Sequence, residues 1–185
     1  MGKASTSRTA KGGSKKEKAL RTISKIPMAK GNPDKNKRVS KGVAGEVKIC
    51  PTCDAVSNIK RWETAPVLHA IYAKDKSVEK ALCPGCQRVK EKYIDGIVEL
   101  NGEVIAKKAK DIKGLIENIL SYARSDDPAN HIVSMKTTGN KLTISTTTVW
   151  LAETIGKAIR RQYKGHLEIH FGHGEEFVRV YWEQK

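Results

Sequence analysis

Apolar side chains recur with helical spacing in two segments of the second half of the chain. From Lys107 to Arg124 they recur every three or four residues, which predicts an amphipathic helix that is stopped by the turn residues 125–128. A second stripe follows Thr148, the expected N-cap, and ends at Gly165. Each helix is therefore expected to bury one face in a core.

Strand patterns surround these two helices. A short strand is expected at Ile97–Leu100, and the Asn101-Gly102 pair after it either ends the strand or forms a tight hairpin. Between the helices, β-branched residues flank Gly139-Asn140, which predicts a two-residue hairpin that joins 132–137 to 141–147. Beyond the second helix, apolar residues alternate with polar ones in two final strands. Their apolar faces are Leu167, Ile169 and Phe171, then Val178, Val180 and Trp182.

The predicted order of these elements is β-α-β-β-α-β-β. This order is typical of an α+β domain with a split βαβ, ferredoxin-like sheet, here with one extra strand and both helices on one face. The domain is expected to span residues 96–185, after a cysteine-containing segment at 49–95.

The first 48 residues have a different composition. They contain few large apolar residues, too few to offset the entropy of ordering the segment, so a disordered tail is expected. A weak helical nucleus at 18–26 would order only against a charged partner. Residues 1 to 48 contain 14 Lys and Arg against three acids, so +11 of the net charge of +15 lies there. Such a balance indicates a polyanionic partner, although a basic run can also serve only solubility.

The chain lacks two kinds of apolar segment. It has no run of about 18 apolar residues that would span a membrane, and no apolar core of a secretory signal near its start. A reducing, cytoplasmic location without membrane association is therefore expected, and disulfides are not.

The four cysteines form two C-x-x-C pairs, Cys50 with Cys53 and Cys83 with Cys86, separated by 29 residues. Each pair can occupy two corners of a tetrahedron around zinc, and four thiolates leave no open position, so the predicted Zn²⁺ is structural. It would compensate for the small core of a zinc ribbon at 49–95. Buried free thiols or redox pairs remain the alternatives.

Basic residues and one tryptophan suggest where a nucleic acid would bind. Those near the cysteines could grip phosphates, and Trp62 could stack on a base or instead pack inside the ribbon. Tail lysines could add sequence-independent affinity. The candidate contacts are Lys15, Lys16, Lys18, Lys35, Lys37, Arg38, Lys48, Lys60, Arg61, Trp62, Arg88, Lys90 and Lys92.

Two further features give weaker evidence of a function. His166, His170 and His173 lie close together, but no other residues complete a second metal site. Arg160, Arg161 and Lys164 are at a helix C-terminus, where the helix dipole already favours them. The chain has no phosphate loop, nucleophile elbow or H-E-x-x-H motif, and we expect no enzymatic activity.

The segment 82–90, with Tyr93, Gly96 and the strand Ile97–Leu100, resembles the zinc region of the large-ribosomal-subunit export adaptor family of the Nmd-three type. Short bacterial proteins of unknown function are similar over about 50–185, including the pair Arg61-Trp62. The export adaptors are longer, with more zinc knuckles and a C-terminal export signal, which makes an export role doubtful.

The resemblance implies a zinc protein associated with ribosomal RNA or the large ribosomal subunit, in assembly or translation. The main alternative is an adaptor or transcription regulator that binds a protein partner through the α+β domain and DNA nonspecifically through the tail. An enzyme with a structural zinc is the third possibility.

Overall fold

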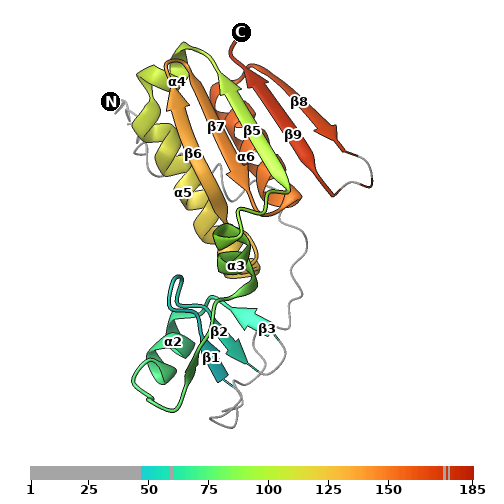
Figure 1. Cartoon of the computed structure of the whole chain (residues 1–185). Helices are drawn as coiled ribbons and strands as arrows, with labels where there is room; N and C mark the ends of the chain where they lie inside the picture. The colour runs from blue at the N-terminus through green and yellow to red at the C-terminus, as the bar shows by residue number, and fades with distance from the viewer. Residues whose placement is uncertain (1–46, 59–60, 173, 175) are drawn as a thin grey trace, which may run out of the picture.

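The computed structural model describes residues 47–58, 61–172, 174 and 176–185. These residues form a cysteine lobe, up to residue 93, and an α+β lobe, from residue 96 (Figure 1). The predicted disorder of the tail and the helical nucleus at 18–26 fall outside the described residues. Within the described part of the chain, no helix is long and apolar enough to cross a membrane.

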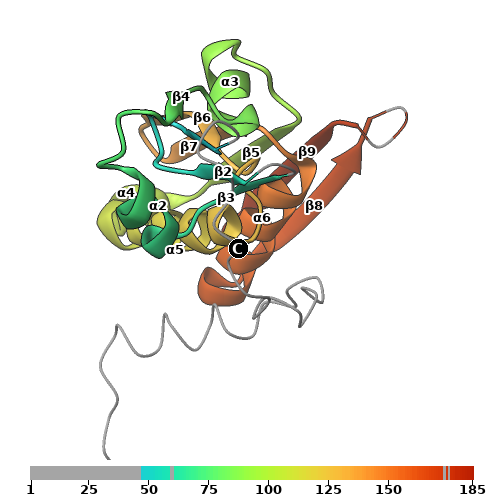
Figure 2. The ribbon, with the colours of Figure 1, turned by 90° about the horizontal axis from the view of Figure 1, so that it is seen from below.

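The α+β lobe contains a five-stranded sheet of order β6-β7-β5-β9-β8. The strands are β5 (Gly96–Asn101), β6 (Ile132–Thr138), β7 (Lys141–Thr146), β8 (His166–Phe171) and β9 (Val178–Glu183). Strand β9 lies parallel to β5, and every other neighbouring pair is antiparallel. The last strand of the chain therefore lies between β5 and β8, and β8 is an edge strand (Figures 1 and 2).

Three helices belong to this lobe: α4 (Glu103–Lys107), α5 (Ala109–Asp126) and α6 (Val149–Tyr163). Figure 1 shows α5 and α6 together behind the sheet, as the two apolar stripes predict. Their apolar faces and the inward residues of the central strands form the main core. Its largest fully buried side chains are Trp182, Leu100, Ile105, Ile112, Ile116, Ile144, Leu151, Ile155 and Ile159.

The ends of these elements follow from single residues. Thr148 caps α6, because its Oγ1 accepts a hydrogen bond from the Leu151 amide at 3.3 Å, as predicted. Gly165 follows α6 with φ +88°, and a Cβ there would lie 2.4 Å from the Glu183 carbonyl oxygen, so this position needs glycine. Asn101-Gly102 ends β5 and leads into α4, and the hairpin alternative at this pair was wrong.

The cysteine lobe is a small sheet of order β3-β2-β1-β4 with two short helices. Its elements are β1 (Val47–Ile49), β2 (Val56–Asn58), β3 (Arg61–Glu63), α2 (Pro66–Tyr72), β4 (Glu79–Lys80) and α3 (Pro84–Lys90). Val47, Val56 and Leu68 are buried in a core of their own. Strand β1 thus includes Val47 and Lys48, which the prediction assigned to the tail, and α2 was not predicted.

Candidate metal centre and the contacts around it

The four cysteine sulfurs converge in the cysteine lobe, all within 4.8 Å of one another. Cys50 and Cys53 come from the turn after β1, and Cys83 and Cys86 from the start of α3. Cys50, Cys83 and Cys86 are buried, and Cys53 is partly exposed. The two C-x-x-C pairs thus meet as the sequence predicts, and together they could hold a metal ion.

Local backbone geometry presets each pair. After β1, the Asp54 amide donates to the Cys50 carbonyl at 3.0 Å and the Cys50 amide to the Ala55 carbonyl at 2.8 Å, which closes the first turn. In the second pair, Pro84 occupies the first turn of α3, and the Cys83 sulfur accepts a hydrogen bond from the Cys86 amide at 3.4 Å. Both turns therefore hold their two sulfurs on one side.

Two of the sulfurs are close enough to form a hydrogen bond. Cys53 Sγ and Cys83 Sγ lie 3.5 Å apart and share a hydrogen bond. This bond lowers the pKa of the Cys53 thiol, whereas the same bond and burial raise the pKa of Cys83. Zn–S bonds of about 2.3 Å would place tetrahedral sulfurs about 3.8 Å apart, so the observed cluster fits a four-thiolate centre.

A small apolar shell surrounds the sulfurs. Ala55 is fully buried beside them, and Trp62 and Leu82 pack against the same cluster. Trp62 therefore packs inside the lobe, which is one of the two expectations for it, and its side chain is partly buried. Stacking of Trp62 on a base remains a prediction. This shell limits the access of water to the sulfurs.

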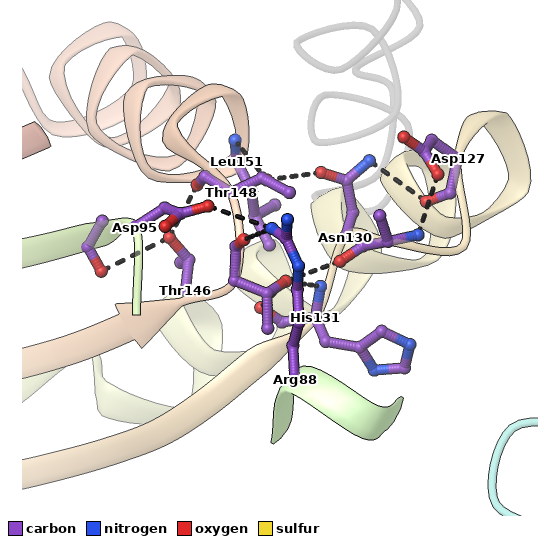
Figure 3. Close-up of polar contacts among 11 residues, drawn as sticks. Arg88, Asp95, Asp127, Asn130, His131, Thr146, Thr148 and Leu151 are labelled. Atoms are coloured by element: carbon purple, nitrogen blue, oxygen red, sulfur yellow. Dashed lines mark hydrogen bonds and ion pairs between the residues drawn. The ribbon is translucent and has the colours of Figure 1, made fainter. Parts of the chain in front are cut away.

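One residue beside the centre was not found from the sequence. His131 is buried in the α+β lobe, yet its Nε2 lies 3.9 Å from Cys86 Sγ. Its backbone is fixed by Thr147, whose Oγ1 accepts from the His131 amide at 2.8 Å and whose amide donates to the His131 carbonyl at 3.0 Å. In Figure 3 the imidazole points away from this network of hydrogen bonds. No spacing rule links it to cysteines 45 residues earlier.

Two more contacts join the cysteine turns to the α+β lobe. A Cβ on Gly85 would lie 2.2 Å from the Pro128 carbonyl oxygen and 2.4 Å from the His131 ring, so only glycine allows this approach. The Arg124 guanidinium donates to the Cys53 carbonyl at 3.2 Å. The candidate metal centre is therefore at the junction of the two lobes.

Arg88 anchors α3 to the same lobe. Its Nη1 donates to Asp95 Oδ2 at 3.0 Å and to the Thr147 carbonyl at 2.8 Å (Figure 3). Its guanidinium also lies 4.9 Å from the centre of the Tyr93 ring. Arg88 was predicted to contact nucleic acid, but here its charge is engaged within the protein.

The other predicted nucleic-acid contacts fall into three groups. Lys48 is paired with Glu79 at 2.9 Å, and Arg61 with Glu63 at 2.8 Å. Lys90 and Lys92 are exposed at the end of α3 and just after it. The remaining candidates lie outside the described residues: Lys15, Lys16, Lys18, Lys35, Lys37, Arg38 and Lys60.

The histidines of β8 do not form a second centre. His166 Nε2 lies 2.9 Å from Glu168 Oε1, and His170 Nε2 lies 3.1 Å from Glu168 Oε2, all exposed. These two bonds, that of His170 first, lower the pKa of the Glu168 carboxyl. Across the ranges that the structure describes, the four cysteines are the only group of three or more such side chains close enough to share a metal. His173 is outside those ranges.

Comparison of the chain with protein-family models, with curated proteins and with solved structures gave no match.

Proposed function

We propose that the chain is a zinc protein in which Cys50, Cys53, Cys83 and Cys86 bind one structural Zn²⁺. The convergence of four thiols within 4.8 Å carries this proposal. Thiolate ligands select zinc among the common divalent ions that have no redox role, and a complete set of four thiolates leaves no position for a substrate. The chain's own residues then fix the fold around the centre, and no catalytic step is assigned to it.

We further propose that this protein binds RNA, and that its site of action is ribosomal RNA or the large ribosomal subunit. The support is the net charge of +15, of which +11 lies in residues 1–48, together with Lys90 and Lys92, which are exposed beside the metal centre. Lysines and arginines neutralise phosphates and release counterions without reading sequence. The resemblance described above favours the large subunit among polyanions.

Sedimentation of cell extract on a gradient, at low and at high salt, tests this proposal. We expect the protein to move with ribosomal particles at low salt and to leave them at high salt, because phosphate contacts weaken as salt rises. A protein that stays at the top of the gradient at low salt contradicts ribosome association.

A protein-interaction adaptor is the second candidate, and one observation favours it. On α2, the side chains of Val67 and Ile71 are 71% and 49% exposed, and their spacing of four residues places these two apolar side chains next to each other on the helix surface. Affinity purification after nuclease treatment separates the candidates. Partners that survive nuclease support the adaptor, and partners lost with the RNA support the RNA-binding protein.

The names of the two folds are part of the same proposal. The cysteine lobe is proposed to be a zinc ribbon, and the α+β lobe a ferredoxin-like sheet in which β9 is inserted beside β5. A non-enzymatic role in the cytoplasm also remains a prediction. Native mass spectrometry that detected a small-molecule ligand would favour an enzyme instead.

A further inference from the structure

A basic groove runs along α6 in the α+β lobe, with Gly165 and Leu167 at the start of β8 forming its far wall. Its volume is about 610 Å³. The helix contributes residues spaced three or four apart, so one continuous face of α6 forms the floor. The lining residues are Trp150, Glu153, Thr154, Lys157, Arg160, Arg161, Lys164, Gly165 and Leu167.

The charge of this groove is strongly unbalanced. Four cationic side chains line it against one acid, Glu153, which pairs with Lys157. Arg160 and Lys164 are exposed and form no ion pair with any residue that the structure describes. The positive charges of Arg160 and Lys164 are therefore open to an anion from outside the chain.

Helix capping does not account for the whole feature. Cations in the last turn of a helix gain about 0.3–1 kcal/mol from its dipole, which covers Arg160, Arg161 and Lys164. Lys157 lies further back along the helix, and Trp150 is further back still, almost four turns from the end of α6. The helix dipole explains neither the groove itself nor the position of the Trp150 indole at its other end.

Trp150 limits the class of ligand that this groove could bind. Trp150 is half-buried and packs against the main core, with the rest of its side chain facing the groove. An indole surface followed by cations that span roughly 10 Å along the helix suits a base and more than one phosphate. In a duplex the bases are stacked on each other, so only an unpaired strand can place one on Trp150.

We propose that this groove binds single-stranded RNA, with Trp150 stacked on a base and Lys157, Arg160, Arg161 and Lys164 contacting the phosphates. This inference rests on the proposed RNA-binding function and gives it a specific surface. That surface is distinct from the metal centre and from the basic tail.

The test is a fluorescence titration of the full chain with a single-stranded RNA oligonucleotide of mixed sequence. We expect binding to quench tryptophan emission, and the Trp150→Phe variant to lose most of this quenching. The double variant Arg160→Gln/Lys164→Gln should bind roughly tenfold more weakly or worse, with a shallower salt dependence. The matched control is Lys110→Gln/Lys113→Gln, two lysines on the exposed side of α5, which should bind like the wild type.

Each outcome has one meaning, provided that circular dichroism and melting show the variants to be folded. If the wild type binds and the α6 variants bind equally well, the groove proposal is wrong and RNA binding stands. If the oligonucleotide does not bind but the protein still sediments with ribosomal particles, the groove proposal is again wrong. If neither occurs, both proposals fail. A mononucleotide or an acidic peptide can also be added as a competitor. If either one, at similar concentrations, weakens the binding of the oligonucleotide equally, the proposal of an extended RNA site is wrong.

Discussion

Cys83 combines three contacts that are separable in principle. It is a candidate metal ligand, it begins α3 as the N-cap, and its sulfur lies 3.5 Å from Cys53. Serine would put a capping hydroxyl oxygen in place of the capping sulfur, because serine is a good N-cap, but it would remove a thiolate. Substitution at this residue therefore separates the contribution of the metal from that of the helix cap.

We predict that Cys83→Ser abolishes stable zinc binding and unfolds the cysteine lobe, while the α+β lobe stays folded. Structural zinc contributes about 10–16 kcal/mol in small finger peptides, far more than the apolar core of this lobe can replace. Zinc content by mass spectrometry and limited proteolysis give the measurement. Thr52→Ser, a substitution at an exposed position between Cys50 and Cys53, is the control. It should keep both the bound zinc and the protection against proteolysis. Unchanged stability on chelation would refute the structural role.

We also predict that His131→Phe weakens zinc binding by roughly 10–100-fold, as loss of a hydrogen bond from outside the ligand set commonly does. Phenylalanine keeps a ring in the buried site but lacks the Nε2 that lies 3.9 Å from Cys86 Sγ. Competition with a chelator measures the affinity. His69→Phe is the matched control, since His69 lies in the cysteine lobe but contacts Asp54 instead of a cysteine. Equal affinities for the two variants would rule out a role for the His131 side chain.

At the scale of single residues, the sequence predicts those sites whose residues have a characteristic spacing along the chain. The four cysteines could be found because ligands within each pair are neighbours along the chain, and tetrahedral geometry limits their separation. His131 and Arg124 could not, since they reach the centre from another lobe through tertiary packing. Arg88 was predicted to contact nucleic acid, because a sequence does not show whether a guanidinium faces solvent or a carboxylate.

Among the elements, α3 connects the two lobes. It carries Cys86 at its start and Arg88 two residues later, and the Arg88 side chain crosses to Asp95 and Thr147. Two hydrogen bonds from one charged group, both partly buried, are worth more than a pair on the surface.

Arg88→Lys is therefore expected to lower the free energy of unfolding by about 1–2 kcal/mol, because an ammonium group cannot reproduce the guanidinium geometry. Urea denaturation provides the value. Arg61→Lys removes a comparable bond from an exposed pair with Glu63 and should change stability by no more than about 0.5 kcal/mol. If both variants lose the same stability, Arg88 has no special role in joining the lobes.

On β8, the side chains of His166, Glu168 and His170 form a His-Glu-His ladder, from which we predict a dependence on pH. The bonds from His170 and His166 lower the pKa of Glu168 in the folded chain. Their contribution to stability is therefore present above the unfolded pKa of about 4.3 and is lost as pH falls through the lower folded value. An NMR titration of the Glu168 carboxyl should show its midpoint rising in His170→Gln and unchanged in His69→Gln. A midpoint that does not move in His170→Gln would contradict the ladder.

Element prediction succeeded where the apolar period is long. The segments that became α5, α6 and the hairpin of β6 and β7 have enough turns or alternations for the pattern to show. The strands of the cysteine lobe have two or three residues each, too few for any period, and the sulfur cluster helps to hold them. The place of β9 between β5 and β8 is also invisible in the order of elements along the chain.

For the whole molecule, we predict that removing residues 1–40 leaves both lobes folded but weakens RNA binding and makes its salt dependence shallower. The removed segment carries 12 of the 35 Lys and Arg and lies outside the described fold. Thermal melting tests the first part, and affinity measured at several salt concentrations tests the second. An identical salt slope would show that the tail contacts no phosphates in the complex.

The contacts across α3 also bear on how this protein can be divided. A cut between residues 95 and 96, where the sequence suggests a domain border, would leave Arg88, Gly85 and the Cys53 carbonyl without their partners on the other side. The cysteine lobe is then a poor candidate for separate expression or for transfer to another protein. Over evolutionary time, substitutions in the knuckles and in the segment 124–131 should be inherited together, although these stretches lie far apart along the chain.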